Sequence, residues 1–154
     1  MLNLDPNSQP FARGDAFRPL EAAKYAASRV EGWPGVGTHR QYVHVVKGIG
    51  PVRVFVEEWK NPEAPDRLFI GPNAMAAARK LLNCQELPLF VRTDEDEPGE
   101  CLGWFKAVRL DRNVEARNRA GQTSSESPTT HEPRTIHGIL HMRHVSDGGP
   151  RSGA

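Results

Sequence analysis

The residues with the clearest potential for chemistry are histidines near the C-terminal end of the sequence. Four of the six histidines gather there, at His131, His137, His141 and His144. On a β-strand, His137 and His141 point to the same face, whereas His144 points to the other. A zinc site would therefore need a ligand from elsewhere, and the candidates are His39, His44 and Cys84. The sequence favours the simpler interpretation, a polar strand face with neutral imidazoles, so no metal or other cofactor is predicted.

Other catalytic patterns are weaker. Glu57 and Glu58 are consecutive in an expected strand, so their carboxylates point to opposite faces and cannot form one acid–base dyad without a bulge. The sequence has no Gly-x-Ser-x-Gly nucleophile motif. The glycines of 32–37 follow a helix rather than a strand and lack the lysine of a phosphate-binding loop. These patterns favour a binding protein over an enzyme.

Aromatic residues beside basic ones indicate a second kind of chemistry, the binding of nucleic acid. Aromatic rings stack on bases, and nearby Arg and Lys neutralise phosphates. The candidate stacking residues are Trp33, Tyr42, Trp59 and Trp104. The candidate phosphate ligands are Arg40, Arg53, Arg92, Lys106 and Arg109, with Arg117 and Arg119 on a flexible loop. For any one ring taken alone, a place in the core or at its edge is the alternative interpretation.

The elements that must position these residues can be outlined from periodicity. Helices are predicted over 19–31 and 72–82, because apolar residues recur at helical spacing in the first and strong helix formers dominate the second. Alternating β-branched residues predict strands over 41–46 and 52–57, which form an antiparallel hairpin. A short apolar run at 67–70 follows, then a second antiparallel pair at 87–92 and 101–110 and a closing strand at 135–145.

This order of elements predicts an α+β fold, a mostly antiparallel bent sheet or small open β-barrel with two helices. Residues 18–146 are expected to form the single domain. Residues 1–17 are expected to be a flexible arm and residues 147–154 a flexible tail. Residues 111–134 show no apolar periodicity and are predicted to be a long loop, either disordered or functional.

Composition constrains the function only loosely. The chain has 154 residues and a formal net charge of +1, so no global field points to nucleic acid or to a membrane. From residue 101 onward, however, eight Lys and Arg residues face five Asp and Glu residues. The default interpretation is a solvated surface of mixed sign, with a local basic face as the alternative. No apolar run approaches the length of a membrane helix, and neither a secretory signal nor a CxxC pair is present. These features predict a cytoplasmic protein with free thiols.

The segment from Leu87 to Phe105 carries a resemblance to a known superfamily. Leu87-Pro-Leu-Phe-Val-Arg92, an acidic turn and Cys101-Leu-Gly-Trp-Phe105 resemble a pattern of restriction-associated domains, with Cys101 in place of the usual aromatic. Those domains are similar to the PUA-like superfamily, which includes the SRA, EVE and ASCH groups, and the likeness covers roughly residues 41–110. The resemblance implies a small bent barrel that binds nucleic acid and often reads a modified or flipped base. It also implies that any nuclease activity comes from a partner or fused domain.

The leading hypothesis is therefore a nucleic-acid-binding module with DNA or RNA as its partner, reading a modified or flipped base in a restriction or defence setting. One alternative is a small metal-dependent enzyme centred on His137 and His141, with His39 or His44 as a further ligand. Another is a protein-interaction domain that pairs its exposed sheet edge with a partner strand.

Overall fold

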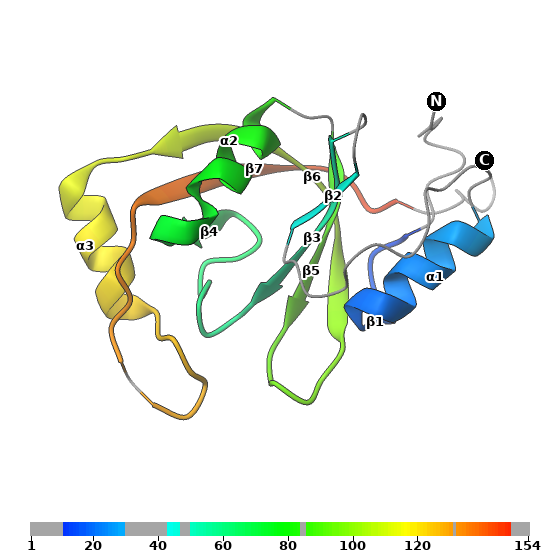
Figure 1. Ribbon diagram of the computed structural model, residues 1–154, viewed down its shortest axis with the longest axis horizontal. Coiled ribbons are helices and arrows are strands. Elements are labelled where there is room, and N and C mark those ends of the chain that lie inside the picture. The colour runs from blue at the N-terminus through cyan, green and yellow to red at the C-terminus, as the bar shows by residue number, and fades with distance from the viewer. Residues whose placement is uncertain (1–10, 30–42, 47–49, 84–85, 131, 149–154) are drawn as a thin grey trace.

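The computed structural model describes residues 11–29, 43–46, 50–83, 86–130 and 132–148, and Figure 1 shows its fold. Three helices and one 3-10 turn accompany seven strands in these residues. In chain order the elements are β1 (Ala16–Phe17), α1 (Pro19–Arg29), β2 (Val43–Val46), β3 (Gly50–Glu57), β4 (Arg67–Ile70), η2 (Pro72–Ala74), α2 (Met75–Leu82), β5 (Leu87–Arg92), β6 (Gly99–Asp111), α3 (Val114–Thr123) and β7 (Gly138–Ser146).

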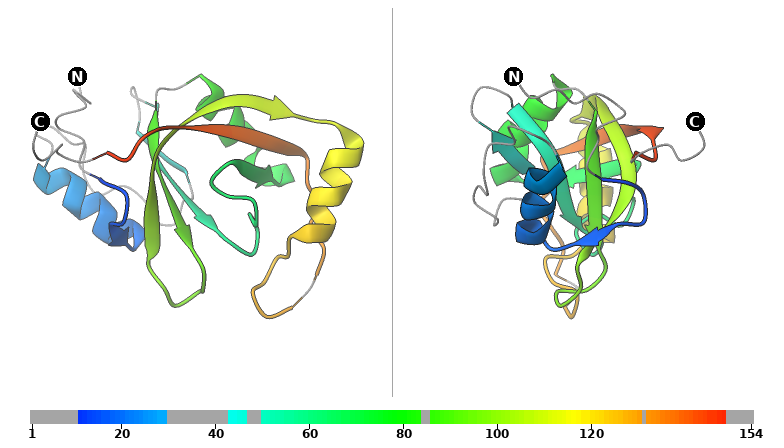
Figure 2. Two further views of the ribbon diagram at one scale, coloured as in Figure 1. Left: turned by 180° about the vertical axis from the view of Figure 1, so that it is seen from behind. Right: turned by 90° about the vertical axis from the view of Figure 1, so that its right-hand side faces the viewer.

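The strands form one sheet with the order β2-β3-β5-β6-β7-β4, and β1 adds to β6. The β3–β5 pair is parallel and the remaining pairs are antiparallel. The sheet curls strongly, and β6 and β7 run side by side toward α3 (Figure 2). The α+β fold class with a bent, mostly antiparallel sheet is confirmed. Both predicted hairpins, β2–β3 and β5–β6, are confirmed as antiparallel pairs.

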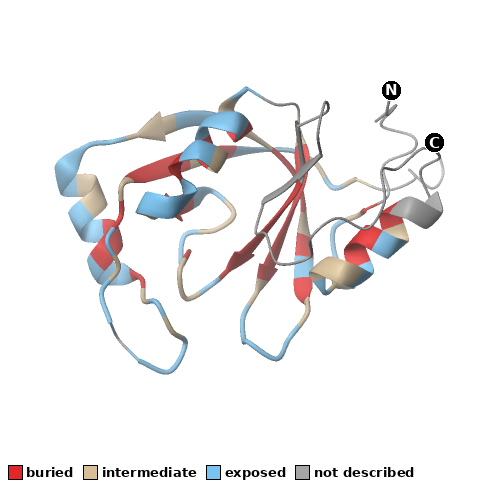
Figure 3. Cartoon of the chain, viewed as in Figure 1, coloured by how far each residue is buried: buried red, intermediate tan, exposed pale blue. Residues whose placement is uncertain are grey.

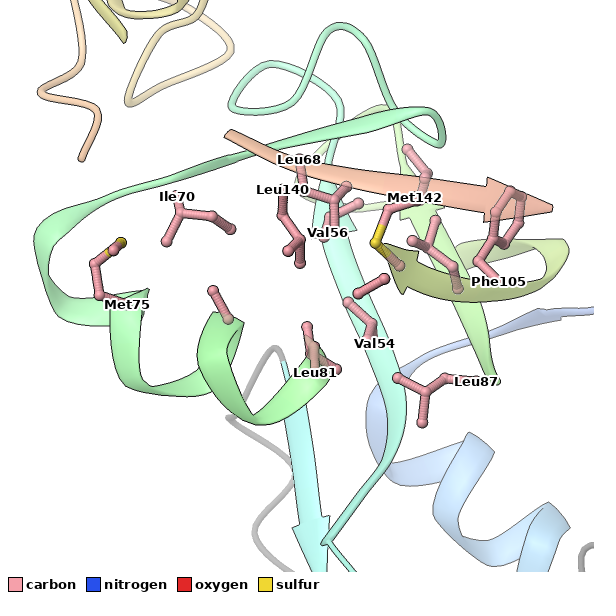
Figure 4. Close-up of a cluster of buried hydrophobic side chains, with 14 residues drawn as sticks. Val54, Val56, Leu68, Ile70, Met75, Leu81, Leu87, Phe105, Leu140 and Met142 are labelled. Carbon is pink, nitrogen blue, oxygen red and sulfur yellow. The ribbon is translucent and has the colours of Figure 1, made fainter. Parts of the chain in front are cut away.

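Three apolar clusters pack against the sheet, and the third of them, Phe69, Ala120, Ile136 and Ile139, lies beside α3. The largest cluster joins α2 to the concave side, with Leu81 of α2 against residues such as Val54, Leu68 and Leu140 (Figure 4). A second cluster lies under α1 and is largely aromatic, with the rings of Phe55 and Phe90 stacked 4.4 Å apart. Burial is therefore concentrated in the strands and in the inner faces of the helices (Figure 3).

The N-terminal segment differs from its prediction as a flexible arm. Phe11 is fully buried, with its ring 5.1 Å from that of Phe90, and Ala16–Phe17 pairs with β6. The backbone N–H of Arg13 also donates to the carbonyl of Asp147, which was assigned to the tail. A single aromatic residue has no periodicity, so the sequence contained no pattern from which the burial of Phe11 could be predicted. Residues 1–10 lie outside the described residues.

The predicted long loop at 111–134 is also wrong in its first half, because Val114–Thr123 forms α3. The side chain of Asn113 caps this helix by accepting a hydrogen bond from the backbone N–H of Ala116 (3.0 Å). Its buried face consists of small residues, and Ala120 packs against Phe69 and Ile139. Alanine and glycine contribute little to a hydrophobic pattern, which is why the helix was missed. Within the described part of the chain, no helix has the length and apolar character needed to cross a membrane.

Candidate functional site

The predicted nucleic-acid-binding residues do not form one cluster. Trp33, Arg40 and Tyr42 lie outside the described residues. Of the rest, Arg53 and Trp104 belong to the interior, whereas Trp59 and Arg92 lie together near the ends of β3 and β5. The last four are basic residues on β6 and α3: Lys106, Arg109, Arg117 and Arg119.

Trp104 is a core residue rather than a stacking surface. Its side chain is 1% exposed, and its indole Nε1 donates a hydrogen bond to the carbonyl of Phe11 (2.9 Å). Gly148, at a φ of +73°, lies so close that a Cβ at this position would collide with the Trp104 ring. The Trp104 ring therefore packs residues from both ends of the described chain against β6. In this buried position it cannot stack on a nucleic-acid base.

Arg53 is likewise withdrawn from the surface. The residue is 1% exposed, and burial lowers its pKa to about 10. A buried guanidinium cannot reach the backbone of a nucleic acid that lies on the outside. The alternation of residues in 52–57 predicts that Arg53 and Val54 lie on opposite faces of the strand. It does not show that the face with Arg53 is also buried.

Trp59 and Arg92 form a contact that the sequence did not predict as a pair. The Arg92 Cζ lies 5.3 Å from the centre of the Trp59 ring, within the range of a cation–π interaction. A Glu57 carboxylate oxygen lies 3.3 Å from Arg92 Nη2, and Arg92 Nη1 donates to the Glu95 carbonyl. Trp59 also lines a depression of about 370 Å³ with Thr93, Thr123 and other residues.

A basic surface lies on the outer face of the sheet, across β4, β7 and β6. Cross-strand partners share a face, and here Arg67 pairs with His141, His141 with Arg109, and Arg143 with Lys106. We call these five residues the basic face. Lys106 and Arg109 are three residues apart and would point to opposite sides of a regular strand. An irregularity between Ala107 and Arg109 returns both to the same side.

The electrostatics of the basic face are visible at His141. The guanidinium Nη2 of Arg109 lies 3.1 Å from His141 Nε2, and because arginine can only donate, this nitrogen of His141 accepts. Burial lowers the pKa of His141, and the charges of Arg109 and Arg67 lower it further, against smaller opposing effects of Asp111 and Glu63. Burial first, and the two guanidinium groups second, therefore favour the neutral form of the His141 imidazole.

The α3 helix borders the basic face. Arg119 lines a depression of about 420 Å³ together with Arg67, His141, Ile139 and five further residues. The lining contains two carboxylates, and both already have a partner. Glu63 forms a salt bridge with Arg67 (2.9 Å), and Asp111 accepts a hydrogen bond from the backbone N–H of Asn113. Arg117 is half-buried in the same helix. Arg117 and Arg119 thus sit on a folded helix and not on the flexible loop that was predicted.

Three residues of the basic face, Arg67, His141 and Arg143, were absent from the predicted interface. A signal for two of them existed, because His141 and Arg143 are two apart in the predicted closing strand and share a face. Their proximity to Lys106 and Arg109 depends on strand order and on the irregularity in β6. Neither of these features can be read from one sequence.

The structure gives no support to the histidine metal site. Among the described residues, no group of three or more His, Cys, Asp or Glu side chains is placed to hold a metal ion. His141 has two guanidinium groups nearby, which disfavour a bound cation. His39, His131 and Cys84 lie outside the described residues, as does the side chain of His44, so the metal-dependent enzyme stays a prediction.

Comparisons with known proteins leave the family open. No protein-family model, no curated protein and no solved structure matches this chain. The resemblance to the PUA-like superfamily therefore stays a prediction.

Proposed function

We propose that this chain is a nucleic-acid-binding module whose basic face contacts the phosphate backbone. The observation that carries the proposal is the register of Lys106 opposite Arg143, next to the row Arg67, His141, Arg109. Like charges placed directly opposite each other across a sheet are destabilising. A bound polyanion would neutralise the positive charges gathered on this face.

The extent of the basic face suits a polymer of phosphates. Adjacent strands are about 4.8 Å apart, so the row from Arg67 to Arg109 spans roughly 10 Å across the sheet. Arg143 and Lys106 extend the face along β7 and β6. A single phosphate would meet only part of this area, whereas DNA presents about one charge per 1.7 Å of helix axis.

Trp59 would supply base stacking in this proposal, with Arg92 already against its ring. Thr123, near the end of α3, lines both the depression beside Trp59 and the depression beside Arg67, so the two sites are neighbours. Reading of a modified or flipped base, in a restriction or defence setting, is the finer form of the proposal. The bent α+β sheet and the resemblance to PUA-like domains support it.

Binding of fluorescent DNA and RNA, single- and double-stranded, at 50 and 200 mM salt tests the proposal. The double variant Arg109→Glu, Arg143→Glu should weaken binding at least about tenfold and lower the salt slope by about 2. The matched control, Arg79→Glu with Lys80→Glu, makes the same charge change at exposed positions of α2. Equal losses in the two double variants, or no binding by the wild-type chain, would overturn the proposal.

The proposal also predicts a pH dependence that resides in His141. Its pKa is lowered in the free protein, whereas a phosphate beside it would favour the protonated ring. Binding then takes up a proton, so affinity should rise as pH falls below the ordinary histidine pKa of about 6.5. Titrations between pH 7.5 and 5.5 should show this rise in wild type and lose most of it in His141→Gln. If affinity still rose at low pH in His141→Gln but not in the His144→Gln control, the pH dependence would belong to His144 and not to His141.

A further inference from the structure

A cavity of about 600 Å³ lies between α2 and strands β3 and β4. Its apolar wall includes Val56 of β3, Ile70 of β4 and Ala77 of α2, each of which keeps some exposed surface. Val56 and Ile70 lie on the side of their strands that faces α2 (Figure 4). The volume falls in the range of small-molecule sites, which are mostly apolar with a few placed polar groups.

The polar end of the cavity is built around Arg134, whose side chain is 10% exposed. Its Nη1 donates to the carbonyls of Lys60 (2.7 Å) and Phe69 (3.4 Å), and its Nε donates to a Glu126 carboxylate oxygen (3.3 Å). Among the described residues Nη2 has no acceptor, and it is not one of the unpartnered atoms that the fold closes off completely. The Nη2 group of Arg134 is therefore an open donor.

The Nη2 donor lies next to the apolar wall. The carbonyl groups of a strand point along the plane of its sheet, so a guanidinium bonded to the Phe69 carbonyl lies at the free edge of β4 and not on either face. The Phe69 N–H points to the same edge, where it donates to Asn61 Oδ1. Gly71 directly follows Ile70 and also lines the cavity, and a Cβ at Gly71 would lie 3.5 Å from Nη2. A molecule between α2 and the strands can therefore reach this donor along the edge of β4.

The charges around the cavity favour a neutral ligand. Its lining contains two cations, Lys60 and Arg134, and two anions, Glu57 and Glu126. A ligand carboxylate at Nη2 would lie beside Glu126 on the same guanidinium, and a ligand cation would be repelled by Arg134 itself. A carbonyl oxygen accepts from Nη2 without either repulsion, and a hydrogen bond to a charged group is stronger than one between neutral groups.

We propose that this cavity binds a small neutral molecule with an apolar body and a carbonyl oxygen that accepts from Arg134 Nη2. The site is separate from the basic face, because Leu68 lines the cavity while its neighbour Arg67 points to the other side of β4. The two proposals can therefore fail independently.

Four single-ring probes test the proposal on the full chain by calorimetry and by amide shifts. Acetophenone supplies a carbonyl oxygen, ethylbenzene lacks it, benzoate carries a negative charge and benzamidine carries a positive one. We expect acetophenone to bind at least tenfold more tightly than benzoate or benzamidine, with amide shifts that cluster at 69–78 and 134–135. Equal affinity for acetophenone and either charged probe, or no binding of acetophenone, would overturn the proposal.

Variants at the polar end test the hydrogen bond. Arg134→Lys keeps the charge and one nitrogen for the Phe69 carbonyl but removes Nη2. We expect it to lower the affinity for acetophenone at least fivefold relative to the affinity for ethylbenzene, which has no acceptor. Gly71→Ala supplies the same test if Arg134→Lys does not fold, because it places a methyl group against Nη2 at a φ of −77°, which alanine adopts freely. An unchanged ratio of the two affinities in the folded variant would contradict the proposed contact.

Variants of α2 locate the site. Ala77 is half-buried and lines the cavity, whereas Ala76 is exposed on the same helix. Ala77→Leu should abolish acetophenone binding, and Ala76→Leu should leave it unchanged. Equal effects of these two variants would place the ligand outside the cavity and overturn the proposal. The double variant Arg109→Glu, Arg143→Glu should retain acetophenone binding whatever its effect on nucleic acid.

Discussion

Replacement of Trp104 by alanine is expected to lower the free energy of unfolding by about 3–5 kcal/mol. The ring is 1% exposed and its Nε1 donates to the Phe11 carbonyl, so the change leaves both a cavity and an unpaired buried acceptor. Urea unfolding followed by far-UV circular dichroism measures the effect without relying on tryptophan fluorescence. At this magnitude a domain at the low end of the usual stability range would be close to unfolding.

The conservative change Trp104→Phe separates the core role from a stacking role. It keeps most of the buried area and removes only the N–H, so it should cost about 1–3 kcal/mol. If the folded Trp104→Phe protein binds nucleic acid as wild type does, the ring acts through the core. If Trp104→Ala were as stable as wild type but no longer bound nucleic acid, Trp104 would instead belong to the binding surface.

Gly121→Ala is expected to lower the free energy of unfolding by about 2 kcal/mol, although alanine is the better helix former. A Cβ on Gly121 would collide with the backbone carbonyl of Arg134. That backbone cannot move freely, because the Arg134 N–H donates to the Gly121 carbonyl (3.0 Å) and Arg134 Nη1 donates to the Lys60 carbonyl (2.7 Å). The collision should outweigh the gain in helix propensity of roughly 1 kcal/mol.

Asn118→Ala is the matched control on the same helix. Asn118 is exposed, so alanine there should gain propensity without meeting a neighbour. Thermal unfolding of the two variants should therefore shift in opposite directions. A Gly121→Ala protein as stable as Asn118→Ala would show that α3 does not pack closely against Arg134.

The elements with strong local signals were predictable from sequence. Alternating valines defined β3, and the run of helix formers after Pro72 placed a helix over 72–82, of which α2 forms most. The helix α3 was missed because its buried face is alanine and glycine, and Phe11 was missed because a lone aromatic has no period. The parallel β3–β5 pair joins segments separated by β4 and α2, and a sequence pattern does not report such partners.

The candidate site was predictable only in part, for the same reason. Lys106 and Arg109 were selected from their charge, but strand order brings Arg67, His141 and Arg143 beside them. Charge and aromatic type also selected Arg53 and Trp104, which tertiary packing buries. Residue type indicates which side chains could belong to a binding surface. The packing of the sheet determines which of them are exposed.

The position of β7 has a consequence for how the chain acquires its fold during synthesis. Strand β7 lies between β6 and β4, so β4 leaves the ribosome long before the strand that it pairs with. Until Leu140 and its neighbours arrive, the apolar residues Leu68 and Ile70 have no strand to pair with. Contacts between distant segments slow folding and prolong the exposure of apolar surface. A nascent chain halted before residue 138 would therefore be a natural client for a chaperone.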